Sequence, residues 1–321
     1  GISKAMQELY DLGFVIQLNQ ASLDTQNVVN NSRIQHFYPW RSVYKDSIST
    51  PIRLVVDPTA SLLNLIMAKG DSSLSSMFQI LIQGRISACC FSTDIRKLYN
   101  MMFLNPDSYP YSLFLYDDSM DPEVPPKVQL MTRAWYGNTA TCSQSSTMLR
   151  LLGTHHASSH PLGAEVLKNR IYVDDAFSGC SSKNELLQQI AQLEHILSSA
   201  GLSMKYLVIS GSPPPENASV DGKSISLLGY SWFPEDDLLA LSISEINFQR
   251  RIRGMKPHNL EPVHTSDDIE KLVSSLPGLT RRQVTAKSSE LYDPLGLIEP
   301  YNASLKRSLS RLSPLGWDDP I

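Results

Sequence analysis

The sequence is poor in cysteine and lacks long apolar runs, and both absences narrow the class of protein. No stretch approaches the ~20 apolar residues that cross a bilayer, and no basic-then-apolar signal peptide begins the chain. The 4 cysteines form no Cys-x-x-Cys pair and have no histidine at zinc-ligand spacing. We therefore expect an intracellular, cytoplasmic protein without a membrane partner. Because the chain begins at Gly1 rather than Met, we also expect it to be a piece of a longer one.

A basic overall charge is missing as well, although nucleic-acid-binding domains commonly have one. The formal net charge is −4 over 321 residues. A positive surface for nucleic acid would therefore have to be confined to a cleft. Basic residues do gather locally, and the solvated face of a helix explains each group equally well. These groups are Arg250, Arg251, Arg253 and Lys256; Arg281 and Arg282; and Lys306, Arg307 and Arg311.

Hydrophobic spacing predicts a mixture of helices and strands. The clearest helix is 183–199, where apolar residues recur at helical spacing before Gly201. From residue 86 onward, the order strand, helix, strand, helix, strand–turn–strand, helix, strand is compatible with a ferredoxin-like core carrying insertions. The other predictions are helices at 3–12 and 139–152, a loop at 17–32, and strands at 51–57, 86–91, 127–134, 170–173, 176–178, 204–209 and 224–232.

The strongest candidate for chemistry is the pair Asp174-Asp175, which directly follows the apolar strand predicted at 170–173. Burying uncompensated carboxylates is costly, so two acids at a strand end call for a cation or a solvent-exposed turn. An ordinary hairpin turn is the alternative, because Asp is favoured in turns. The apolar pair Ala176-Phe177 places this turn between two buried strands, which favours the cation.

A third carboxylate, Asp94, ends another apolar strand. If the two strands are neighbours, three acids meet at one edge of a sheet. Mg²⁺ prefers oxygen ligands and keeps several waters, so such acids together with substrate phosphates form a natural site. Two ions, with Mn²⁺ as the alternative to Mg²⁺, would then clamp the attacking and leaving oxygens of a phosphoryl transfer.

Three further residues are candidates for substrate contacts, and each has a plainer explanation. Tyr99, five residues after Asp94, would lie under the sugar of a nucleotide; a core tyrosine is the alternative. Arg53 offers a guanidinium for phosphate, or else makes a surface ion pair. Gly137 allows close approach of the backbone to a base pair, or else forms a simple turn.

Taken together, these residues resemble the reverse transcriptase of Pao/BEL LTR retrotransposons. The similarity runs through nearly the whole chain, and the order and spacing of the motifs make it more specific than a lone Tyr-x-Asp-Asp. The chain departs from the family at Trp40-Arg41, where a histidine pair is usual, and in a more polar helix after Gly137. The matching segments are Phe37-Tyr38-Pro39-Trp40 to Val43-Tyr44-Lys45, Arg53-Leu54-Val55-Val56-Asp57 with Ala60-Ser61, Asp94-Ile95-Arg96-Lys97 with Tyr99, Tyr136-Gly137-Asn138, Tyr172-Val173-Asp174-Asp175, Leu228-Gly229-Tyr230 with Trp232, Tyr292-Asp293-Pro294-Leu295-Gly296-Leu297-Ile298 with Pro300, and Gly316-Trp317-Asp318-Asp319.

The resemblance implies an α+β, right-hand polymerase fold with a ferredoxin-like palm, fingers and a partial thumb or connection. The implied boundaries are fingers 1–85, palm 86–105, a fingers insertion 106–136, palm 137–233 and a thumb-like region 234–321. The implied activity is RNA- and DNA-directed DNA synthesis. The implied partners are a primed RNA or DNA template, dNTPs and further polyprotein domains (RNase H, integrase, peptidase), and the implied location includes virus-like particles.

The resemblance also implies a role for each site residue. Asp94, Asp174 and Asp175 hold the metal ions, and Arg53 contacts the incoming triphosphate while Tyr99 selects its sugar and Gly137 lies at the base pair. Lys205 protonates the leaving pyrophosphate. The segment Leu228, Gly229 and Tyr230 grips the primer.

Two other functions remain open at this point. A decayed, non-catalytic remnant would bind nucleic acid without turnover, and the departures from the family pattern are typical of a decaying genomic copy. An aspartic peptidase is the third candidate, because such polyproteins contain one. That enzyme needs Asp-Thr-Gly or Asp-Ser-Gly, and neither tripeptide occurs in the sequence.

Overall fold

The computed structural model describes residues 1–44, 52–71, 74–119, 121, 123–219, 221–241, 278–289 and 292–321. Lys45 of the matching segments and the basic group Arg250, Arg251, Arg253 and Lys256 lie outside these residues. None of the helices in the described ranges is both long and apolar enough to cross a membrane.

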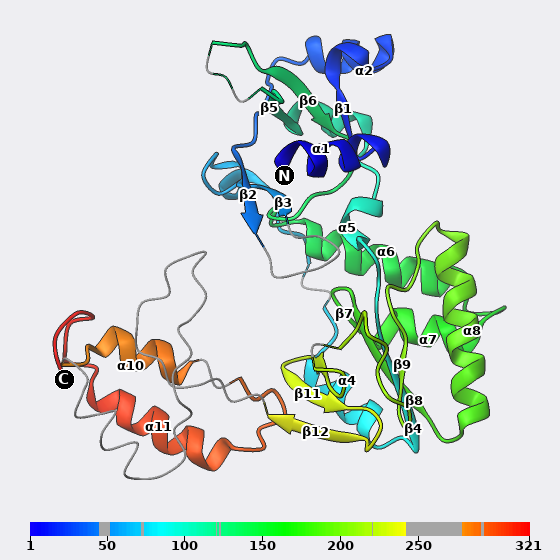
Figure 1. Ribbon diagram of the computed structural model, residues 1–321, viewed down its shortest axis with the longest axis vertical. Coiled ribbons are helices and arrows are strands. Elements are labelled where there is room, and N and C mark those ends of the chain that lie inside the picture. Colours follow the sequence, from blue (N-terminus) through cyan, green and yellow to red (C-terminus); the bar gives the residue numbers. More distant parts are fainter. Residues whose placement is uncertain are drawn as a thin grey trace.

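A four-stranded antiparallel sheet of order β7-β8-β4-β9, which we call the central sheet, lies at the lower right in Figure 1. If the strands β4, β7, β8 and β9 are numbered 1 to 4 along the chain, their order across the sheet is 2-3-1-4. Helices connect strand 1 to strand 2 and strand 3 to strand 4. This is the ferredoxin-like arrangement, so the prediction of a ferredoxin-like core is confirmed. The core comprises β4 (Cys89–Asp94), α6 (Thr141–His155), α7 (Pro161–Asn169), β7 (Ile171–Tyr172), β8 (Asp175–Cys180), α8 (Lys183–Ser199) and β9 (Val208–Ile209).

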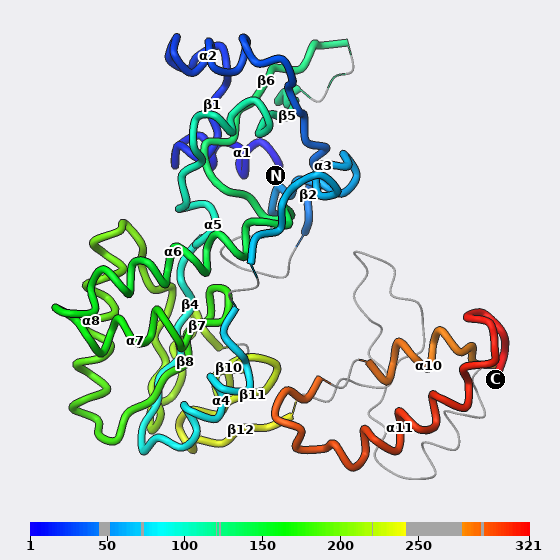
Figure 2. Tube along the Cα trace, turned by 180° about the vertical axis from the view of Figure 1, so that it is seen from behind, coloured from blue at the N-terminus to red at the C-terminus, as the bar shows by residue number. Residues whose placement is uncertain are grey.

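Successive residues of the central strands face opposite sides of the sheet, and each side has its own apolar cluster. Phe91 and Ala176 pack with residues of α6, α7 and α8. Cys90 and Phe177 pack on the other side with α4 (Met77–Arg85) and with the hairpin of β10 (Ile225–Leu227) and β11 (Tyr230–Phe233). Figures 1 and 2 show α7 and α8 on the side of the sheet away from α4. Helix α4 (Met77–Arg85) approaches so closely that a Cβ on Gly84 would lie 2.2 Å from the Phe177 ring. Helix α4 lies within residues 1–85, the range predicted as fingers, and it packs on the central sheet.

A second sheet, of order β1-β6-β5, lies at the N-terminal end of the molecule beside the two-stranded hairpin β2–β3 (Figure 1). Its core contains Met6, Phe14, Tyr38, Phe114 and Trp135. This part comprises α1 (Ile2–Asp11), β1 (Val15–Gln17), η1 (Leu18–Gln20), α2 (Leu23–Asn30), β2 (Trp40–Tyr44), β3 (Ile52–Val56), α3 (Leu63–Ile66), α5 (Leu98–Met101), η2 (Pro106–Tyr111), β5 (Leu113–Tyr116) and β6 (Lys127–Met131).

Several predictions of local structure were wrong. The region 17–32, predicted as a loop, contains η1 and α2, because Ser22 caps the helix by accepting from the Thr25 N–H and Val29 is buried beneath it. The single strand predicted at 224–232 is a hairpin of β10 (Ile225–Leu227) and β11 (Tyr230–Phe233), which is extended by β12 (Leu238–Leu241). The strand predicted at 204–209 is shorter, since only Val208–Ile209 forms β9.

The C-terminal residues form α10 (Arg281–Ser288) and α11 (Glu299–Arg311), which lie apart from the sheets (Figure 2). A capping box between Thr280 and Gln283 begins α10, and a bridge between Thr280 and Pro320 joins the ends of this unit. Neither helix has a buried residue. The unit therefore has little core of its own.

Candidate functional site

The turn between β7 and β8 brings the predicted acidic residues to one end of the central sheet. Antiparallel pairing places Asp94 directly opposite Asp175, and Asp174 lies in the turn beside them. The Ile95 N–H donates to the Asp174 carbonyl at 2.9 Å, which ties the turn to the end of β4. Val173 has a φ of +61°, a left-handed conformation that is costly for a β-branched residue and that clusters at functional sites.

The carboxylates influence one another electrostatically. The pKa of Asp175 is raised to about 7, first by burial and then by the charges of Asp174 and Asp94. The pKa of Asp174 is also raised, by burial and by Asp94, while Lys205 and Arg53 act in the opposite direction. The folded protein therefore holds negative charges together at a cost in free energy.

Lys205 is bound to Asp94 twice. Its backbone N–H donates to the Asp94 carbonyl at 2.8 Å, and its Nζ lies 3.0 Å from Oδ2 of Asp94. Because the Lys205 side chain is 44% exposed, this ion pair remains accessible to solvent. An ammonium in this position can compensate the carboxylates or supply a proton beside them.

The donor set suits a hard divalent cation such as Mg²⁺, which prefers carboxylate oxygens. A cation would relieve the repulsion that raises the pKa values of Asp174 and Asp175. Among the described residues, however, no three His, Cys, Asp or Glu side chains are grouped so that they could hold one ion. The fold thus brings the three backbone positions together, and the ammonium group of Lys205 contacts Asp94.

Arg53 and Tyr99 lie near the acids, on different elements. Arg53 is on β3, and its charge acts on both Asp174 and Tyr136. Tyr99 is on α5, and its ring centroid lies 4.8 Å from that of Tyr136. Burial is the largest cause of the raised pKa of Tyr99, and the charge of Asp174 contributes. A guanidinium and a tyrosine pair therefore border the acidic end of the sheet.

Gly137 lies where the segment before α6 meets the end of β3. Its φ is +112°, and a Cβ there would lie 3.0 Å from the Val56 carbonyl oxygen and 3.1 Å from Pro58. The Asn64 side chain donates to the Gly137 carbonyl at 3.0 Å and accepts from the Thr139 N–H at 3.0 Å. The glycine is required here by both conformation and space.

The segment Leu228, Gly229 and Tyr230 forms the turn and the first residue of β11. Leu228 and Gly229 have φ values of +46° and +96°, the left-handed pair that two-residue hairpin turns adopt. Tyr172, two residues before Asp174, packs against the apolar cluster that includes Leu228 and Tyr230. The hairpin therefore shares its core with the strand that carries the acids.

Sequence reasoning missed Tyr206 as a site residue. Burial raises its pKa first, and the charges of Asp175, Asp94 and Asp174 raise it further. Tyr136, noted only as part of a motif, also responds to Asp174, Arg53 and Asp94 after burial. The only sequence signal for Tyr206 was its position next to Lys205.

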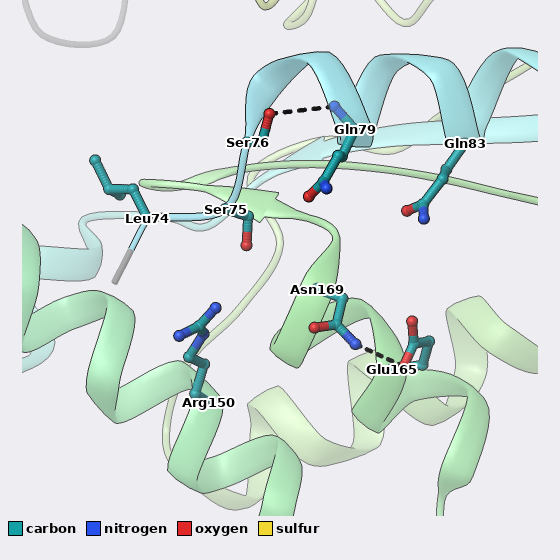
Figure 3. A pocket seen from close by; sticks show the side chains of 8 residues that line it. All are labelled: Leu74, Ser75, Ser76, Gln79, Gln83, Arg150, Glu165 and Asn169. Carbon is teal, nitrogen blue, oxygen red and sulfur yellow. Dashed lines mark hydrogen bonds between the residues drawn. The ribbon is translucent and has the colours of Figure 1, made fainter. Parts of the chain in front are cut away.

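A polar hollow of about 400 Å³ lies elsewhere, between α4 and the helices α6 and α7 (Figure 3). Gln79 and Gln83 face it from α4, Arg150 from α6, and Asn169 from α7, where the Asn169 side chain donates to Glu165 at 2.9 Å. None of the predicted site residues lines it.

No family model matches the chain, and no curated protein matches it either. Solved structures do. A foamy viral protease-reverse transcriptase with double-stranded DNA matches with a TM-score of 0.60 at 14% identity over 99% of this chain. A foamy viral protease-reverse transcriptase with an RNA/DNA hybrid matches with a TM-score of 0.54 at 15% identity over 97% of it. The chain spans 44% and 33% of those two proteins, less than half of either.

These similarities show the fold. The chain has the α+β, right-hand polymerase fold of the solved reverse transcriptase structures, and the ferredoxin-like sheet is part of it. The fold prediction is therefore confirmed. At this level of identity the likeness extends to architecture alone.

Proposed function

We propose that this chain is the polymerase region of a reverse transcriptase of the Pao/BEL type, which extends a primer on an RNA or DNA template with dNTPs. The observation that carries the proposal is the register of β4 and β8, which sets Asp94 opposite Asp175 with Asp174 in the adjoining turn. The fold and the order of the sequence motifs support it. The resemblance beyond the fold rests on the motifs alone.

In the proposed reaction, the primer 3′-OH gives its proton to water and attacks the α-phosphate of the dNTP. A phosphodiester bond forms, and the bond between the α-phosphorus and the oxygen shared with the β-phosphate breaks. Asp94, Asp174 and Asp175 are the residues that would hold two Mg²⁺ ions, and these ions would supply electrostatic stabilisation of the phosphoryl transfer. Lys205, 3.0 Å from Asp94, would give its proton to the departing pyrophosphate.

The other site residues bind and select substrates. Arg53 would pair with the triphosphate of the nucleotide, because a guanidinium matches phosphate geometry. Tyr99, supported by its contact with Tyr136, would exclude a ribose 2′-OH. The hairpin segment Leu228, Gly229 and Tyr230 would hold the primer strand through its backbone, because the side chains of Leu228 and Tyr230 are buried. We extend the proposal to virus-like particles as the location and to RNase H, integrase and peptidase as neighbouring domains.

Incorporation of dNTPs on a primed RNA template in the presence of Mg²⁺ tests the proposal. We expect Asp175→Asn and Asp94→Asn to abolish incorporation, whereas Asp24→Asn, on the exposed first turn of α2, leaves it unchanged. A folded wild-type protein that incorporates nothing would contradict the proposal.

The ion pair between Lys205 and Asp94 favours one alternative, a non-catalytic remnant that binds nucleic acid. In that protein Lys205 would permanently compensate the acids and no metal ion would be needed. Salt-sensitive binding of a primed template without any incorporation would identify the remnant.

A further inference from the structure

A buried tyrosine of the hairpin is joined to the loop that precedes α11. Tyr230 is only 1% exposed, and its hydroxyl donates to Oδ1 of Asp293 while accepting from the Leu295 N–H at 2.9 Å. Burial, followed by the hydrogen bond to Asp293, raises the pKa of Tyr230 to about 12. The hydroxyl therefore stays protonated and available as a donor throughout the physiological range.

Asp293 organises this loop around itself. Its other oxygen, Oδ2, accepts from the Ile298 N–H at 2.7 Å. Although burial alone would raise its pKa, the hydrogen bonds from Ile298, Tyr230, Leu297 and Gly296 outweigh burial and lower it. The carboxylate is thus ionised and bound to donors from both the hairpin and the loop. Charge-assisted hydrogen bonds of this kind are about twice as strong as neutral ones.

The same loop covers the turn of the hairpin. The ring of Tyr292 lies so close to Gly229 that a Cβ on the glycine would be 2.5 Å from Cδ1 of the ring. Leu295 packs against the apolar cluster on that side of the central sheet. Tyr292 also reaches α4, where its hydroxyl lies 3.4 Å from Sδ of Met77.

We infer that Tyr230 and Asp293 are positioning residues, which lock the hairpin turn Leu228-Gly229 to the start of α11. We call the set Tyr230, Tyr292, Asp293 and Leu295 the hairpin clasp. The turn needs such support because Leu228, with a φ of +46°, is in a conformation that leucine rarely adopts. Helix α11 begins at Glu299, directly after the loop, so the clasp joins the hairpin to the C-terminal helices.

This inference rests on the proposed function, since the hairpin is the segment that would grip the primer. With the clasp intact, the hairpin and α11 present one connected surface to the primer–template. Without it, the turn and the helix move independently, and the duplex dissociates more easily. The chemical step depends on the acids and is expected to change little once the duplex is bound.

The test compares Tyr230→Phe with a matched control, Tyr116→Phe. Tyr116 is also buried and also donates to an aspartate, Asp118 at 2.6 Å, but it belongs to the sheet β1-β6-β5. We expect Tyr230→Phe to raise the Kd for a primed template, measured by fluorescence anisotropy, about five- to tenfold, the factor for one lost hydrogen bond. The rate of incorporation at saturating primed template should fall by a smaller factor than the Kd rises. Tyr116→Phe should leave both values unchanged.

Hydrogen exchange provides a second measurement that does not depend on activity. Amides of Glu299–Arg311 should exchange faster in Tyr230→Phe than in wild type, and at the wild-type rate in Tyr116→Phe. Asp293→Asn, compared with Asp118→Asn, repeats the test from the other partner and serves if Tyr230→Phe does not fold.

The outcomes separate the two proposals. If wild type binds and extends a primer but both clasp variants behave like their controls, the clasp is overturned and the polymerase stands. If folded wild type neither binds nor extends a primer, the proposed function is overturned and the positioning role with it.

Discussion

The Nζ of Lys205 lies 3.0 Å from Oδ2 of Asp94, on the residue that faces Asp175 across the central sheet. Lys205 is therefore both a neighbour of the candidate metal ligands and a competitor for them. Replacing it separates these two effects.

We expect Lys205→Met to slow dNTP incorporation at saturating Mg²⁺ about 100-fold, because a positioned general acid contributes on that order. The Mg²⁺ concentration for half-maximal rate should fall, since a positive charge has left Asp94. Lys183→Met, which removes an exposed lysine at the start of α8 and outside the proposed site, should change neither value. An unchanged rate would remove Lys205 from the proposed reaction.

The raised pKa of Asp175 makes stability depend on pH. Its pKa rises from 3.8 to about 7 on folding, so folding disfavours the ionised form. The contribution of Asp175 to the free energy of unfolding is therefore fully present below pH 3.8 and is lost as the pH rises through about 7. Without Mg²⁺, we expect Asp175→Asn to be more stable than wild type at pH 8 by about 1–2 kcal/mol, with the difference shrinking toward pH 5.

Thermal melting at several pH values, with and without Mg²⁺, measures this effect. Mg²⁺ should raise the Tm of wild type at pH 8 more than that of Asp175→Asn, because the cation compensates a charge that the variant lacks. A Tm difference that is independent of pH would show that Asp175 is not ionised at a cost in the folded protein.

Tyr99 is expected to control sugar selection. Its ring is held 4.8 Å from the ring of Tyr136, which gives it a fixed position beside Asp174. We expect Tyr99→Val to raise the efficiency of ribonucleotide incorporation relative to dNTP incorporation by about 10- to 100-fold, the range for a change in steric fit. Tyr136→Phe keeps the ring pair and should retain selectivity. Equal discrimination in Tyr99→Val would show that another group excludes the 2′-OH.

Gly137 is expected to be needed for folding as well as for its position. Gly137→Ala would bring a Cβ to 3.0 Å from the Val56 carbonyl at a φ of +112°. We expect a loss of stability of about 2 kcal/mol or more, measured by urea unfolding. Gly13→Ala is the matched control, since its φ is +65° but no atom lies within 4 Å. If the two variants lose equal stability, the close contact adds nothing to the backbone strain.

Local sequence patterns predicted those helices and turns that are marked by residues within or directly beside the element. The helix 183–199 was confirmed at both ends, because its apolar spacing is regular and Ser182 accepts from the Glu185 N–H at its start. The turn at Asp174-Asp175 was likewise marked by two short apolar strands on either side. The order of helices and strands was then enough to indicate the ferredoxin-like core.

Other elements could not be read in this way. Helix α7 begins at Pro161 and is short, so its apolar residues gave no long periodic pattern. In the hairpin β10–β11, Leu228 occupies a left-handed turn position where Asn or Gly is usual, so this position carries no typical turn residue. Tertiary packing overrides these local preferences, because the hairpin buries Tyr230 and Trp232 against the central sheet.

By itself, the sequence determined which residues supply the carboxylates of the candidate site, where the strands next to these residues end, and which segments become the main helices. Only the tertiary structure decided that Asp94 faces Asp175, that Lys205 binds Asp94, and that Tyr230 meets Asp293. Each of these contacts joins segments far apart in the chain. Their register depends on how helices and sheets pack together, and no short stretch of sequence contains that information.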